Sequence, residues 1–172
     1  YVDFFNEVVK HTAVMIARWQ AQGFSHGVMT TDNMSILGLT IDYGPFGFLE
    51  TYNPKFVCNH SDHEGRYAFE QQPGIALWNL ARLGDSLESL IDAKQSKAVL
   101  DNYQAYLVKA YSKLMRQKFG FIKKDDQDNV LIGQFFEVLY QNQKDYTNSL
   151  RQLSDIDQLS KDTDFTDWIE AH

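Results

Sequence analysis

Apolar residues at helical spacing, over most of the chain, constrain this fold more than any other sequence feature. Within residues 2–22 the apolar side chains Phe5, Val9 and Trp19 fall on one helical face, and Gly23 follows as a helix stop. The same spacing predicts further helices over residues 73–84, 96–118, 130–140, 146–153 and 165–169. The fold class indicated by the sequence is therefore mainly α.

One stretch, residues 34–41, instead shows the alternation that is typical of a strand. Leu37, Leu39 and Ile41 would share one face, and Gly38 marks a close backbone approach or a bulge. The turn that follows contains two glycines and a proline, so neither a helix nor a strand continues through it. The sequence thus predicts a small β-hairpin near the start of a helical domain.

Composition narrows the classes of protein and partner. With 172 residues, 44% of them hydrophobic, the chain has the size of one globular domain over residues 1–172. Its formal charge of −7 repels phosphate backbones, so nucleic acid is not an expected partner. The single Cys58 excludes an internal disulfide and favours a reducing compartment. No apolar stretch approaches the roughly 20 residues that cross a bilayer, so we expect a soluble protein without a membrane partner.

Hard oxygen ligands gather around the predicted hairpin. Asp32 and Asn33 precede it and Asp42 follows it, so pairing of its two arms would bring its ends close together. Carboxylate and amide oxygens are ligands that Mg²⁺ prefers, and the pattern is compatible with a magnesium–phosphate site. The alternative is purely structural, because Asp and Asn also organise turns by bonding to the nearby backbone. Spacing alone favours this second interpretation.

A loop over residues 50–72 offers another set of polar side chains. His60, Asp62 and His63, together with His26, could in principle serve a metal-dependent phosphohydrolase if they converged on one ion. Adjacent positions make such convergence difficult, so hydrogen bonds that anchor the loop are the preferred interpretation of these residues.

Residues 26–48 closely resemble the signature stretch of the selenoprotein O family. The resemblance extends to further segments at residues 59–62, 65–67, 72–73, 77–80 and 145–148. It implies a protein-kinase-like fold that binds ATP in an orientation flipped relative to kinases. It also implies transfer of AMP, rather than phosphate, from ATP to Ser, Thr or Tyr hydroxyls of protein substrates.

The resemblance assigns roles to individual residues. It implies that Asp32 is the catalytic base, that Asn33 and Asp42 bind Mg²⁺ or Mn²⁺, and that Asp42 also contacts the nucleotide through that metal. His26 would hold the loop by side-chain hydrogen bonds. Thr30 stands where members of the family usually have Asn, which alters a loop position without removing a metal ligand.

The resemblance also implies what surrounds the chain. It would be the helical, C-terminal lobe of the kinase-like fold, with the catalytic loop and metal-binding hairpin at residues 26–48. The N-terminal nucleotide lobe and the C-terminal tail of the family would be absent, so we expect weak ATP binding, no transfer by the fragment alone, and self-association through the uncovered surface. The expected location is the bacterial cytoplasm, or the mitochondrion in a eukaryote. The alternative function is a non-catalytic helical module that binds a protein partner.

Overall fold

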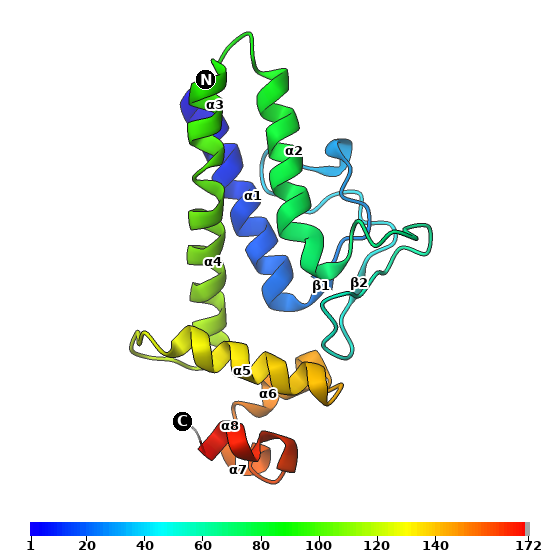
Figure 1. The fold of residues 1–172 in the computed structure, drawn as a ribbon, viewed down its shortest axis with the longest axis vertical. Coiled ribbons are helices and arrows are strands. Elements are labelled where there is room, and N and C mark those ends of the chain that lie inside the picture. Colours follow the sequence, from blue (N-terminus) through cyan, green and yellow to red (C-terminus); the bar gives the residue numbers. More distant parts are fainter. Residues whose placement is uncertain (171–172) are drawn as a thin grey trace.

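The computed structural model describes residues 1–170, which form helices and one short antiparallel sheet (Figure 1). The helices are α1 (Val2–Gln22), α2 (Gln72–Ser86), α3 (Ala93–Leu100), α4 (Tyr103–Lys118), α5 (Asp128–Gln141), α6 (Tyr146–Gln152), α7 (Ile156–Leu159) and α8 (Thr166–Glu170). Strands β1 (Phe24–Ser25) and β2 (Gly47–Phe48) pair antiparallel, and short 3₁₀ turns occupy Thr31–Asn33, Phe69–Gln71 and Thr163–Phe165. The predicted mainly α class with a small β element is confirmed, although the two strands lie outside residues 34–41, where the hairpin was expected.

Helix α1 lies at the centre of the first of two apolar cores. It packs along α4 and also contacts α2 and α3, and its side chains Phe5, Val9 and Trp19 are buried as the periodicity predicted (Figure 1). Each apolar side chain of this size contributes about 1.5–3 kcal/mol when it leaves water. Gly23 ends the helix in the left-handed conformation, and its N–H bonds to carbonyls of the last turn.

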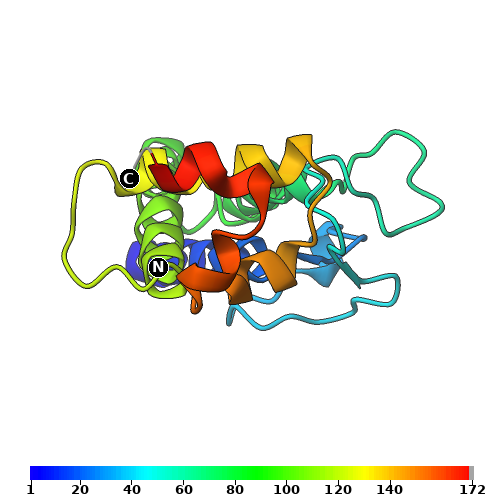
Figure 2. The ribbon, with the colours of Figure 1, turned by 90° about the horizontal axis from the view of Figure 1, so that it is seen from below.

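The second core contains α5 to α8 and joins the first through α4 and the end of α1. Phe135 and Phe165 are fully buried there, and Tyr111 of α4 contacts both cores. The Tyr146 hydroxyl lies 3.1 Å from the carbonyl oxygens of both Gln20 and Ala21, in the last turn of α1. Figure 2 shows that the loops between β1 and α2 extend from one side of this helical body.

The predicted strand over residues 34–41 is wrong. Only one isolated antiparallel bridge, between Met34 and Thr40, forms in this stretch. Between these two residues the chain makes a turn, in which the Gly38 N–H donates to the Ser35 carbonyl. The alternating side chains, including Leu37 at 65% exposure, have no sheet face to cover. The close approach predicted at Gly38 is confirmed, because a Cβ there would lie 2.8 Å from the His11 carbonyl oxygen.

The single helix expected over residues 96–118 is two helices, α3 and α4, which join at Asp101 and Asn102. The Asn102 N–H bonds to Val99, three residues earlier, so the regular ladder of bonds to the fourth preceding residue is interrupted. Asp and Asn compete with helical hydrogen bonding through their side chains and favour helix ends, which accounts for the break.

Helix α2 holds the segment that begins the candidate site. The side chain of Gln72, which is fully buried, accepts a hydrogen bond from the His26 N–H and donates one to the Phe24 carbonyl, each at 2.9 Å. Asn79 lies on the same face of α2, two turns further along, and its side chain donates a hydrogen bond to the Met29 carbonyl at 2.9 Å. We call this pair of side chains the amide clamp.

Replacement of Gln72 by Leu tests the clamp. The variant leaves the His26 N–H and the Phe24 carbonyl buried without partners, so we expect the free energy of unfolding to fall by about 2–4 kcal/mol. Urea denaturation of the chain measures this difference. The control is Gln71→Leu at the neighbouring exposed position, where we expect a change below about 0.5 kcal/mol. Equal stability of the two variants would contradict the assignment.

Candidate active site

His26 is a buried positioning residue. Its Nδ1 lies 3.3 Å from the Val28 N–H, which can only donate, so the proton is on Nε2, which donates to the Ile41 carbonyl at 2.8 Å. Burial lowers the pKa of His26, and the Ile41 hydrogen bond and the Asp42 charge oppose this effect. A neutral imidazole with both nitrogens engaged holds the loop, which confirms the role expected for this side chain.

Asn33 belongs to the 3₁₀ turn Thr31–Asn33 and is buried against the same loop. Its Nδ2 donates to the Val28 carbonyl at 3.1 Å, which fixes the amide. Because the nitrogen is engaged, the amide presents its oxygen as the remaining polar atom, and an amide oxygen is a suitable ligand for a hard cation.

Asp42 follows the carbonyl that His26 holds. It is exposed and has a φ of 51°, a left-handed conformation that few residues other than glycine adopt. The strand-like bridge of Met34 with Thr40, and a 2.9 Å hydrogen bond from the Trp19 indole to the Thr40 hydroxyl, fix the backbone just before it. Strained conformations of this kind persist where neighbours determine them, and they gather at functional sites.

Asp32 lies beside Asn33 and is exposed to solvent. A hydrogen bond from the Thr30 side chain, followed by one from its own backbone, lowers the pKa of Asp32. The carboxylate is therefore ionised near neutral pH and can accept a proton. Thr30 thus contacts the expected base directly.

The three predicted site residues are connected through one short segment. Val28 binds the Asn33 amide, while His26 binds the carbonyl that immediately precedes Asp42. Segment His26–Val28 therefore sets the position of both expected metal ligands, and Asp32 is next to one of them. The sheet-like pairing expected of the hairpin is almost absent. The hydrogen bonds of His26 to the Ile41 carbonyl and of Asn33 to the Val28 carbonyl connect these residues instead.

The donor set fits a metal that a nucleotide helps to hold. Within residues 1–170 no three His, Cys, Asp or Glu side chains converge as a metal-binding group. Mg²⁺ usually takes only one or two carboxylates from the protein and completes its shell with water and substrate phosphates. The Asn33 amide oxygen and the Asp42 carboxylate suit this arrangement, and Mn²⁺ accepts the same oxygen ligands.

The phosphohydrolase interpretation of the loop over residues 50–72 is wrong. Asp62 accepts backbone hydrogen bonds from Arg66 and Tyr67 at 2.9 and 2.8 Å, which makes it the loop anchor that was expected. His60 and His63 are exposed, and within residues 1–170 neither belongs to a group of three or more His, Cys, Asp or Glu side chains that could hold a metal.

Several residues that position the site were not identified from sequence. The clamp residues Gln72 and Asn79 lie seven positions apart, on one face of a helix that otherwise buries apolar side chains. Polar amides on a buried helical face were the available signal, since such groups require hydrogen-bond partners. Asn59 donates to the Gly27 carbonyl at 3.2 Å from the loop opposite, and no local pattern indicated that contact.

Comparisons with known proteins identify the family of this chain. A family model described as "Protein adenylyltransferase SelO" matches residues 1–171. A protein nucleotidyltransferase YdiU of Aliivibrio salmonicida is 56% identical over 157 residues, which cover 91% of this chain and 32% of that protein. The protein of the same description from Aliivibrio fischeri strain MJ11 is 53% identical over 163 residues, covering 95% of this chain and 34% of its own length.

The chain therefore spans about a third of the length of these relatives. In residues 1–170 no helix combines the length and the apolar character needed to span a membrane. With a family model that matches nearly every residue and relatives that share more than half of the aligned positions, this chain belongs to the SelO family of protein adenylyltransferases.

Proposed function

We propose that this chain carries the catalytic base and the metal ligands of an enzyme that transfers AMP from ATP to hydroxyls of protein substrates. The observation that supports it most is the shared support of Asn33 and Asp42 by segment His26–Val28, next to an ionised and accessible Asp32. The family membership supports nucleotidyl transfer as the reaction class. Because the chain spans about a third of its relatives, the activity is proposed for the longer protein.

The proposed reaction uses each residue in a separate role. Asp32 accepts the proton of a Ser, Thr or Tyr hydroxyl as the hydroxyl oxygen attacks the α-phosphorus of ATP. The new oxygen–phosphorus bond forms as the bond to the bridging oxygen breaks, and pyrophosphate leaves with that electron pair. Asn33 and Asp42 would hold Mg²⁺ or Mn²⁺, whose charge offsets that of the α-phosphate and the departing pyrophosphate. Positioning and electrostatics supply most of the rate in such transfers.

The exposed apolar side chains around the site support the presence of a further lobe. Ile36, Leu37, Leu39, Phe46 and Phe48 are each at least 45% exposed, and all belong to the segment that carries the metal ligands. Apolar surface gathered in one segment is typical of an interface. We propose that the nucleotide lobe of a kinase-like fold covers it, and that copies of the isolated chain associate through it. Protein substrates, ATP and a cytoplasmic location complete the proposal, and neither nucleic acid nor membrane takes part.

Replacement of Asp42 by Ala tests the metal site. We place this chain in the Aliivibrio salmonicida relative, in exchange for the matching segment, so that the nucleotide lobe is present. The variant should bind Mg²⁺-ATP at least about 100-fold more weakly by calorimetry, since the nucleotide loses a metal ligand. The control is Asp157→Ala on the exposed side of α7. Unchanged binding by Asp42→Ala would contradict the metal site and favour the alternative function, a non-catalytic module that binds a protein partner.

Replacement of Asp32 by Ala separates chemistry from binding in the same chimaera. Binding of Mg²⁺-ATP should stay within about threefold, while transfer of radiolabelled AMP to protein should fall by about 10²–10⁴, the usual contribution of a positioned base. Loss of transfer and binding together would instead place Asp32 among the metal ligands.

Residues 1–172 alone should bind Mg²⁺-ATP at least about 100-fold more weakly than the chimaera and transfer no AMP. The physical reason is that a cleft that buries the adenine of ATP and orients its phosphates needs the second lobe. Calorimetry and radiolabel transfer on the two proteins, side by side, measure this difference. Comparable transfer by residues 1–172 would show that this chain holds the whole nucleotide site.

A further inference from the structure

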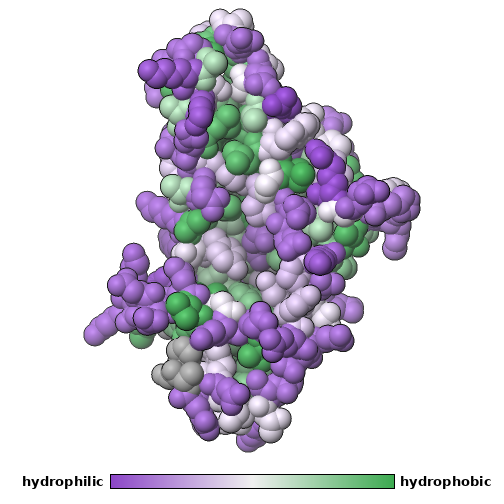
Figure 3. All heavy atoms as spheres, in the orientation of Figure 1, coloured by the Kyte–Doolittle hydropathy of each residue, from purple (hydrophilic) through white to green (hydrophobic). Residues whose placement is uncertain are grey.

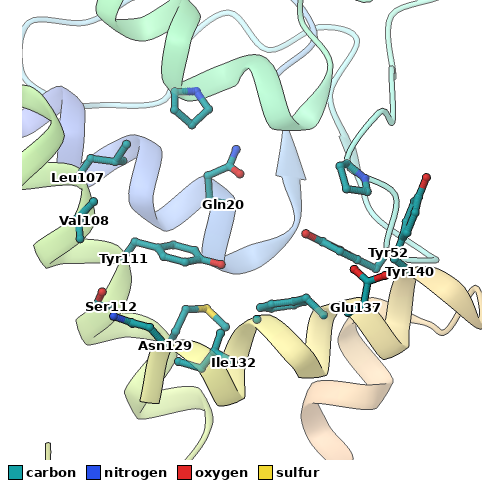
Figure 4. A pocket seen from close by; sticks show the side chains of 15 residues that line it. Gln20, Tyr52, Leu107, Val108, Tyr111, Ser112, Asn129, Ile132, Glu137 and Tyr140 are labelled. Carbon is teal, nitrogen blue, oxygen red and sulfur yellow. The ribbon is translucent and has the colours of Figure 1, made fainter. Parts of the chain in front are cut away.

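A cavity lies between helices, away from the candidate active site. It has a volume of about 730 Å³ and opens between the end of α1, helices α4 and α5, and the loop that contains Tyr52 and Pro54 (Figure 4). Small-molecule sites in proteins have volumes of about 300–1,000 Å³. None of the side chains that line the cavity comes from residues 26–48. The cavity is therefore separate from the proposed transfer site.

The body of the cavity is apolar. Leu107 and Met115 of α4 face Ile132 and Phe136 of α5 across it, and all four side chains are buried. Val108, on the same wall, is 48% exposed. Figure 3 shows that apolar atoms also reach the surface between polar ones on this face of the molecule. An apolar body of this kind accepts the hydrocarbon part of a ligand.

One end of the cavity is acidic and aromatic. Glu137 is the only charged side chain in the lining, which contains no Lys, Arg or His from the described residues. Figure 4 places Glu137 beside Tyr52 and Tyr140 at this end. Burial raises the pKa of the Tyr52 hydroxyl, and the negative charges of Glu70 and Glu137 raise it further. A carboxylate beside aromatic rings attracts a cation and repels an anion.

Gly133 keeps the cavity open. It lies inside α5, where glycine is a poor choice because it weakens a helix relative to alanine. A Cβ at this position would meet no atom within 4 Å, so packing of the chain does not require glycine here. Gly133 lines the cavity, and any side chain at this position would project from α5 into open space. Glycine therefore leaves this part of the cavity wall without a side chain.

We propose that this cavity binds a small amphipathic organic cation. The hydrocarbon part packs between α4 and α5 over Gly133, and the ammonium group lies against Glu137 and the rings of Tyr52 and Tyr140. The apolar wall supplies binding energy, and the acidic end selects a cation over a neutral or anionic molecule of the same length. This proposal does not depend on the proposed transfer reaction.

Three probes of equal chain length test the selectivity: octylamine, octanol and octanoate. Titration of the chain, followed by NMR shifts of the α5 amides, should show octylamine binding at least tenfold more tightly than octanol, with octanoate weakest. Equal binding of octylamine and octanol would overturn the proposal, and so would the absence of any octylamine binding up to its solubility limit.

Two variants test the two parts of the cavity separately. Glu137→Gln should reduce octylamine binding to the level of octanol and leave octanol binding unchanged. Gly133→Leu places a side chain in the cavity and should weaken binding of both probes, while its melting temperature by circular dichroism is no lower than that of the parent chain. The control is Glu88→Gln, at an exposed position outside the lining, which should bind all probes as the parent does. Parent-like binding by either cavity variant would contradict the proposal.

Discussion

The amide clamp of α2 is the interaction on which the candidate site depends. Gln72 satisfies the carbonyl of Phe24 in β1 and the N–H of His26 directly after it, and Asn79 satisfies the Met29 carbonyl further along. Buried backbone groups need such partners, and a two-residue strand supplies few of its own. Asn79 Oδ1 has no partner among the described residues, so a single hydrogen bond offsets its burial. Side chains from a packed helix therefore take the place of a sheet.

A short series of contacts connects the clamp to the proposed site residues. The clamp fixes His26, whose ring holds Ile41, and Asp42 follows directly in the chain. Val28, two residues after His26, holds the Asn33 amide. Exposed loops are usually the mobile part of a fold, but here side chains of α2 and Trp19 of α1 hydrogen-bond to the segment at several points. This arrangement connects the two proposed metal ligands, Asn33 and Asp42, to segment His26–Val28 without extended strands.

The two sites differ in how the chain uses negative charge. At the candidate active site, Asp32 and Asp42 are exposed on loops, where a metal and a nucleotide can reach them. In the cavity between α4 and α5, the carboxylate of Glu137 is also exposed, but it lies at one end of a mainly apolar lining and accepts a hydrogen bond from Gln141 at 2.7 Å. The two sites share no lining residue, so each can be altered without changing the other's side chains. An overall charge of −7 favours cations in both.

Helical periodicity in the sequence alone determined α1, including its end at Gly23, and indicated most of the later helices. Residue types also indicated Asp32, Asn33 and Asp42 as possible oxygen ligands, because carboxylate and amide chemistry does not depend on the fold. Their separate roles as base and metal ligands came from the resemblance to the family and stay predictions. Only the tertiary structure decided that residues 34–41 are not a strand, since pairing requires a neighbouring strand that no local pattern reveals. It alone decided which carbonyls Gln72, Asn79 and Asn59 bind, and where a cavity remains between α4 and α5, because contacts between distant segments are set by packing.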